Sequence, residues 1–246
     1  MNPTLCRQLS LDYCCSEGDV RSPDSIFTEY APREGRRRFD DAGDCCFLKL
    51  AAVNGKLLCT GRGDIVAALE PLLHGADAAW SMDAARLRSI DELLRPFGCR
   101  IRQAHPFYIA EHSSPEKTGS YTLQWYNRSD ILRFRNDDRF CEAYGFCETA
   151  PDVLGVAAVR DGEILAMAGA SADSPLMWQL GINVLPAQAG NGLGTALVTA
   201  LKNAVLEAGR LPYYGTSLSH IASQRVALGA GFSPAWAELI TEALPV

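Results

Sequence analysis

Apolar and polar residues alternate most regularly in the C-terminal half of the chain. Between residues 176 and 184, large apolar side chains occupy every second position, and the positions between them are smaller or more polar. This period of two is typical of a β-strand with one apolar face. Over residues 192–208, leucine, valine and alanine instead recur every three or four positions, which predicts an amphipathic helix that ends at Gly209.

Short apolar runs separated by two turn residues predict β-hairpins. Asp161-Gly162 separates residues 152–159 from 163–170, and Asn54-Gly55 separates 46–53 from 56–60. Further strands are expected at residues 100–110, 121–126, 212–217 and 233–239, and helices at 65–73, 83–97, 130–134, 137–144 and 221–228.

The order of these elements predicts an α/β protein with a mixed sheet and helices on both faces. Antiparallel hairpins come first and a crossover helix comes later. Residues 112–119 are polar, contain proline and glycine, and separate two structured parts. We therefore expect a smaller N-terminal α/β accessory domain, residues 1–118, and a C-terminal domain, residues 119–246.

The segment between the alternating strand and the amphipathic helix is rich in glycine. Gly190, Gly192 and Gly194 stand at every second position. Such a turn lets N–H groups at a helix N-terminus approach a phosphate. The dinucleotide pattern G-x-G-x-x-G fails because Thr195 holds the sixth position, and no P-loop sequence is present. A purely structural turn is the alternative, although one glycine would suffice for it.

Together with Val184 and Pro186, this turn resembles the acetyl-CoA-binding motif of GNAT-type acyltransferases. Residues 219–232 resemble the last strand–helix–Gly-Phe segment of that superfamily. The resemblance covers about residues 119–246, and a narrower likeness points to a bacterial subgroup with an extra N-terminal domain. It implies a GNAT-like acyl-CoA transferase fold that uses acetyl-CoA as co-substrate and no metal.

The resemblance also implies where CoA binds. The pyrophosphate would lie on the N–H groups of residues 189–195, at the positive end of the helix dipole, and pantetheine would run beside the strand that precedes them. The implied CoA-binding residues are Ile182, Asn183, Val184, Ala189, Gly190, Asn191, Gly192, Leu193, Gly194, Thr195 and Ser223. Two positions depart from the superfamily pattern. Ala189 stands where Arg or Gln is usual, and Ala227 stands where a Tyr commonly protonates the leaving thiolate.

The implied reaction is N-acyl transfer from acetyl-CoA to a primary amine of a small molecule or peptide by direct attack. The amine must lose a proton, and the leaving thiolate can use a proton donor. Asp173 is the first candidate for the base, although an ordinary turn Asp is equally consistent with its position, and Glu148 is a more distant candidate. Tyr214 and His220 are the candidates for the acid, and a purely structural role is the alternative for each.

Gln179 and Asn183, on the less filled face of the strand, are candidates to orient the acceptor or are satisfied buried amides. Because the usual acid is missing, a second interpretation stays open. The domain could bind acyl-CoA as a sensor or interaction module without catalysing transfer.

The composition of the chain limits the kinds of molecule that it is expected to bind. A net charge of −6 argues against a nucleic-acid-binding face and suits a cationic amine acceptor. No apolar run is long enough to span a membrane. Nine cysteines without a secretion signal or a Cys-x-x-Cys pair predict reduced thiols in the cytoplasm and no metal site. The sequence leaves a homodimer open.

Overall fold

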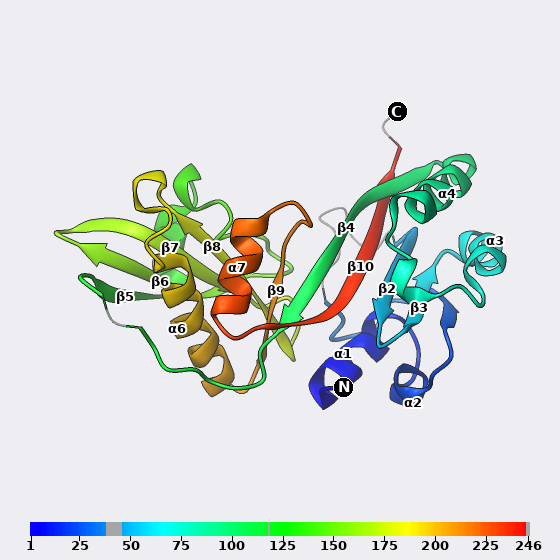
Figure 1. Ribbon diagram of the computed structural model, residues 1–246, viewed down its shortest axis with the longest axis horizontal. Helices are drawn as coiled ribbons and strands as arrows, with labels where there is room; N and C mark the ends of the chain where they lie inside the picture. Colours follow the sequence, from blue (N-terminus) through cyan, green and yellow to red (C-terminus); the bar gives the residue numbers. More distant parts are fainter. Residues whose placement is uncertain (38–45, 118, 245–246) are drawn as a thin grey trace. The chain divides into compact units, whose positions relative to one another are not determined.

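The computed structural model describes residues 1–37, 46–117 and 119–244 (Figure 1). Contacts divide the chain into two compact units, which are described separately. Unit 1 comprises Met1–Phe107 and Ala235–Val246, and unit 2 comprises Tyr108–Pro234. This division precedes the polar segment 112–119, and it groups the C-terminal residues with unit 1. The expected domains, residues 1–118 and 119–246, stay a prediction.

Hydrogen bonds explain why residues 112–117 belong to unit 2. The buried Lys202 Nζ donates to Ser114 Oγ at 2.6 Å. The side chain of Asn203 accepts from Ser114 N at 3.0 Å and donates to Ser114 O at 2.8 Å. Both partners lie on one helix of unit 2, so the polar segment is fastened to that helix.

Unit 1 contains a sheet with the strand order β1-β3-β2-β10-β4. Its strands are β1 (Ile26–Glu29), β2 (Leu48–Val53), β3 (Lys56–Gly61), β4 (Cys99–Ile109) and β10 (Ser233–Ala243), the last two of which extend past the unit boundary. Asn54 and Gly55 have φ of 48° and 79°, as the predicted two-residue turn requires.

Helices α3 (Gly63–Leu73) and α4 (Ala84–Leu94) share an apolar core with the sheet of unit 1. Two short 3-10 helices, η1 (Ala78–Trp80) and η2 (Arg95–Phe97), lie near them in sequence. Helices α1 (Pro3–Asp12) and α2 (Glu17–Arg21) precede β1. The buried Arg37 pairs with Asp12 of α1 at 2.6 Å and with Glu238 of β10 at 2.7 Å, which joins the two ends of the chain within unit 1.

The sheet of unit 2 has the order β9-β8-β7-β6-β5. Its strands are β5 (Thr122–Asn127), β6 (Asp152–Arg160), β7 (Glu163–Ser171), β8 (Met177–Val184) and β9 (Leu211–Gly215). Neighbours from β5 to β8 are antiparallel, whereas β8 and β9 are parallel. Helix α6 (Leu193–Glu207) makes the crossover between them, and α7 (Ile221–Gly229) follows β9. The predicted mixed α/β fold is confirmed.

Alternating residues of this sheet enter two cores. Val156 and Ala158 of β6 pack on the face that α6 and α7 cover, and Ala157 packs on the opposite face. Figure 1 shows α6 across the first face with α7 beside it. The opposite core includes residues of α5 (Arg128–Ile131) and of the 3-10 helices η3 (Leu132–Phe134) and η4 (Asp138–Phe140).

The predicted helix at residues 137–144 is wrong beyond η4. Two N–H groups after η4 donate to Asn183 Oδ1 on β8, from Glu142 at 2.9 Å and from Ala143 at 2.8 Å, and Ala143 N also bonds Phe140 O at 3.1 Å. A side-chain acceptor on the sheet thus competes with helix carbonyls for these donors.

Candidate functional site

Strands β8 and β9 separate part-way along β8. Their register pairs run from Met177↔Leu211 to Gln179↔Tyr213, and β8 then continues to Val184. On its other edge β8 stays paired with β7 as far as Ala166↔Val184. In the described part of the chain, residues 180–184 therefore present one main-chain edge outside the β8–β9 register. An extended ligand can bind such an edge with its own amide groups.

The glycine turn lies directly beyond this edge. Pro186 begins the short helix η5 (Pro186–Gln188), and Gly192 is the N-cap of α6. The first bond within α6 runs from Ala196 N to Gly192 O at 3.0 Å. The N–H groups that precede it in the first turn have no partner inside the helix, so they are available to an anion at the positive end of the helix dipole.

The three glycines have different functions. Gly190 and Gly192 are exposed, have φ of 82° and 77°, and have no atom within 4 Å of an added Cβ. The space beside them can therefore hold a phosphate group. Gly194 is buried, and a Cβ there would lie 3.1 Å from Val226 of α7 and 3.3 Å from Val184. It allows α7 and β8 to pack closely against the first turn of α6.

A buried pair of hydroxyl groups joins β9 to α7. Tyr214 Oη and Ser223 Oγ are 2.8 Å apart. Burial raises the pKa of Tyr214, and the Ser223 hydrogen bond lowers it in part. Ala227, one turn after Ser223, is completely buried in the same core as Tyr214 and Phe232. The Tyr214 ring packs edge-on against Phe232, with ring centroids 6.0 Å apart.

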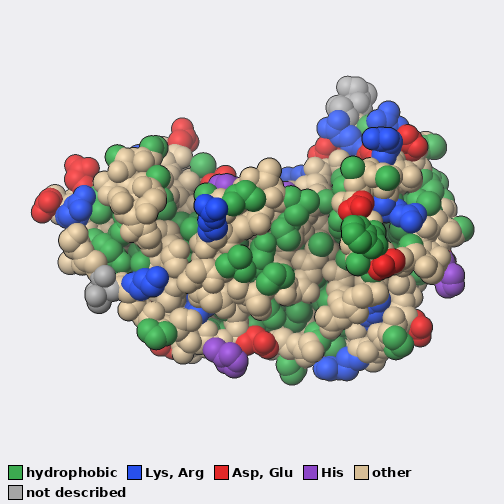
Figure 2. All heavy atoms as spheres, viewed as in Figure 1, with side chains coloured by type: hydrophobic (Ala, Val, Ile, Leu, Met, Phe, Trp, Pro, Cys, Tyr) green, Lys and Arg blue, Asp and Glu red, His purple; other side chains and the backbone are tan. Residues whose placement is uncertain are grey.

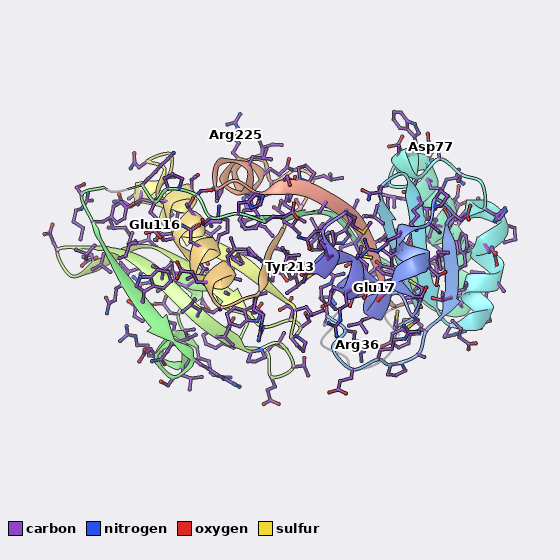
Figure 3. All side chains as sticks on the ribbon, turned by 90° about the horizontal axis from the view of Figure 1, so that it is seen from below. Glu17, Arg36, Asp77, Glu116, Tyr213 and Arg225 are labelled. Carbon is purple, nitrogen blue, oxygen red and sulfur yellow. The ribbon has the colours of Figure 1, made fainter. Side chains whose placement is uncertain are left out.

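A second buried network lies where β8 and β9 separate. The Tyr213 hydroxyl donates to Asp173 Oδ2 and is 3.1 Å from Gln179 Oε1 (Tyr213 is labelled in Figure 3). Asp173 also accepts a bond from Ser171 Oγ at 2.7 Å, and only 7% of the residue is exposed. Because Gln179 and Tyr213 form the last register pair, this network closes the inner end of the gap.

The sequence of unit 2 identifies the family. Residues 104–232 match the model of the acetyltransferase (GNAT) family, which is more than half of the chain. The chain belongs to the GNAT acetyltransferase family. The matched region includes the glycine turn, β8, β9 and α7, and the resemblance expected from the sequence is confirmed.

Solved structures of GNAT proteins resemble this chain more distantly. An acetyltransferase from Novosphingobium aromaticivorans is 18% identical, with 59% of this chain and 68% of that chain covered and a TM-score of 0.45. A GCN5-related N-acetyltransferase-like protein from Streptococcus suis is 16% identical, with 65% and 68% covered and a TM-score of 0.46. The acetyltransferase yncA from Salmonella typhimurium, solved with acetyl-CoA, is 14% identical, with 52% and 95% covered and a TM-score of 0.38. No curated protein matches the chain in sequence.

The predicted site residues of this GNAT chain fall into three groups. Asp173 meets Tyr213, and Tyr214 meets Ser223, so the structure brings each of these pairs together. Asn183 Oδ1 accepts two bonds that anchor the segment after η4, and its assignment to CoA stays a prediction. His220 is exposed at the N-cap of α7 and makes no capping hydrogen bond with its side chain. The catalytic and CoA-binding assignments stay predictions.

Glu142 is a charged residue at this site that the sequence pattern did not indicate. Gly155, Gly169 and Gly181 lie side by side on β6, β7 and β8. We call them the glycine stripe. A Cβ on Gly181 would be 1.9 Å from Glu142 O, and one on Gly169 would be 2.0 Å from Ala143 O. Glycine inside a strand indicates a close approach of another backbone, and this signal was present in the sequence.

Charge and burial elsewhere add few candidates. No group of three or more His, Cys, Asp or Glu side chains within residues 1–37, 46–117 and 119–244 could hold a metal ion. The helices among those residues include none that is long and apolar enough to cross a membrane. On the face shown in Figure 2, Lys and Arg side chains are interspersed with Asp and Glu.

Proposed function

We propose that unit 2 transfers an acetyl or other acyl group from acyl-CoA to a primary amine by direct attack. The proposal is carried by the family match over residues 104–232, combined with the exposed glycine turn next to the β8 edge that lies outside the β8–β9 register. Acetyl-CoA is the proposed co-substrate. The turn fits its phosphates because Gly190 and Gly192 leave open space in front of a helix N-terminus.

Main-chain groups bind most of the donor in this proposal. The N–H groups of residues 190–195 hold the pyrophosphate, and the edge of residues 180–184 bonds the amide groups of pantetheine. Ala189 offers no side-chain contact. Leu193 is buried in the core against the sheet, so it contributes only its N–H group.

Acyl-CoA supplies a thioester carbonyl, and transfer forms a C–N bond while the C–S bond breaks. A β8 N–H group stabilises the developing oxyanion. Tyr214 donates a proton to the thiolate, with Ser223 holding its hydroxyl. A tyrosine is already protonated at neutral pH, as a proton donor must be, and burial moves the pKa of Tyr214 further above that range. Asp173 as the base stays a prediction, and the hydrogen bonds that it accepts from Ser171 and Tyr213 favour a role in positioning Tyr213.

Replacement of Tyr214 by Phe is expected to lower kcat by about 10- to 100-fold without weakening CoA binding. The range is at the low end for proton transfer because a thiolate is a good leaving group. Because the Tyr214 pKa is raised, wild-type kcat should not fall through its ionisation as pH rises through the neutral range. Stopped assays of CoA thiol release at several pH values measure the kcat of the variant and the pH dependence of the wild-type kcat. Tyr121→Phe, which removes a hydroxyl bonded to Lys117 O, is the control. Equal kcat in the two variants contradicts the assignment.

The overall proposal is tested by release of free CoA thiol from acetyl-CoA over a panel of primary amines. We expect turnover with at least one amine. We also expect calorimetry to detect CoA binding when no amine is present. If NAD or ATP stabilises the protein against unfolding and CoA does not, any CoA-based function is refuted.

The alternative function is an acyl-CoA sensor or interaction module. Two observations favour it: Ala227 stands where a tyrosine commonly acts as the acid, and Asp173, the first candidate for the base, is buried. CoA binding without thiol release on any amine of the panel would support this alternative over the transferase.

A further inference from the structure

The segment after η4 lies directly on the sheet of unit 2. The glycine stripe provides the necessary space, because a side chain at Gly169 or Gly181 would overlap main-chain oxygens of this segment. Tyr144 lies over the other end of the stripe, where a Cβ at Gly155 would be 1.9 Å from its hydroxyl. The segment is thereby fixed against β6, β7 and β8.

Glu142 is anchored by its main chain, which leaves its carboxylate available. Its N–H group bonds Asn183 Oδ1 at 2.9 Å, and its carbonyl oxygen lies over Gly181. Both partners belong to residues 180–184, where β8 has left the β8–β9 register. Glu142 is exposed, so its main chain is fixed beside residues 180–184 while its side chain is accessible to solvent.

The charge of Glu142 acts on the reacting region. It contributes to the raised pKa of Tyr214, after the larger effect of burial. Tyr214 belongs to the core that α6 and α7 cover, whereas Gly181 faces the segment after η4. Tyr214 and Glu142 therefore approach the β8–β9 gap from opposite faces of the sheet. An acceptor that reached the thioester from the side of Glu142 would meet this carboxylate.

We propose that Glu142 binds the acceptor amine as its ammonium ion, so that the acceptor is a cationic primary amine. This inference rests on the proposed transferase function. A carboxylate and an ammonium ion form a charge-assisted hydrogen bond, and the carboxylate can take the proton that the amine loses before attack. Asp173 is less suited to this role because it is buried and already accepts bonds from Ser171 and Tyr213.

The test compares Glu142→Gln with wild type on spermidine, glucosamine and tyramine as cationic probes, and on glycine and taurine as zwitterionic ones. We expect wild type to prefer the cationic amines. The variant should lose about 10- to 100-fold in kcat/KM for them, mainly through KM, which is the range for a hydrogen bond between charged groups. CoA affinity should be unchanged, and Glu142→Asp should recover part of the loss.

Glu207→Gln, the same charge change at the exposed C-terminal end of α6, is the matched control and should behave as wild type. Equal kinetics of Glu142→Gln and Glu207→Gln overturn the inference. So does a wild-type protein that acylates only the zwitterions, or one that binds CoA and acylates none of the probes. Failure of wild type to bind CoA would instead overturn the proposed function itself.

Discussion

Gly192→Leu is expected to weaken CoA binding by about 100-fold or more while the fold is retained, a loss of about 2.7 kcal/mol in binding free energy. Gly192 is the N-cap of α6, and no atom lies within 4 Å of an added Cβ. The Cβ of a leucine therefore enters open space, and its side chain would extend into the space proposed for the phosphates. Isothermal titration with CoA measures the effect.

Gly209→Leu is the matched control for this experiment. Gly209 follows the C-terminal end of α6, has φ of 71°, and also has no atom within 4 Å of an added Cβ. Both variants carry a similar backbone penalty of about 1–2 kcal/mol, because both need a left-handed conformation. We expect similar losses in Tm but a loss of CoA affinity only in Gly192→Leu. Equal CoA affinity in the two variants would refute the proposed phosphate site.

The secondary structure of unit 2 follows from local sequence to a large degree. Strand β8 and helix α6 lie within one or two residues of their predicted bounds, because their apolar positions repeat over eight residues or more. The hairpin at Asp161-Gly162 is confirmed by positive φ at both residues.

In unit 1, helices α1 and α2 and strand β1 were not predicted. Strand β1 has only four residues, so its pattern holds too little periodic information.

The side-chain roles at the candidate site depend on contacts between distant parts of the chain. Asn183 bonds N–H groups about forty residues earlier, and the Tyr213 hydroxyl reaches Asp173 across a similar separation. Neither contact leaves a mark in the local pattern. The glycine turn could be predicted because one short segment supplies it. Only the packing of α7 shows that Gly194 has a different role from Gly190 and Gly192.

A substitution in the glycine stripe is expected to lower both the stability of the protein and its affinity for the acceptor. Gly181→Ala places a Cβ 1.9 Å from Glu142 O, so the segment after η4 must move. Overpacking of this kind costs about 1–3 kcal/mol. Displacement also breaks the bonds of Glu142 and Ala143 to Asn183, at about 1 kcal/mol each. We expect a loss of about 3 kcal/mol or more in the free energy of unfolding, measured by denaturant titration.

The same variant separates the two halves of the proposed site. The added Cβ faces the segment after η4, and both the glycine turn and the main-chain edge of residues 180–184 remain, so Gly181→Ala should keep most of its CoA affinity. The displaced Glu142 should raise KM for cationic amines. Gly145→Ala is the control, because Gly145 lies in the same connection, has no positive φ, and has no atom within 4 Å of an added Cβ. If the two variants are equally stable and equally active, the segment does not depend on the stripe. Glu142 would then lack the fixed position from which its role is inferred.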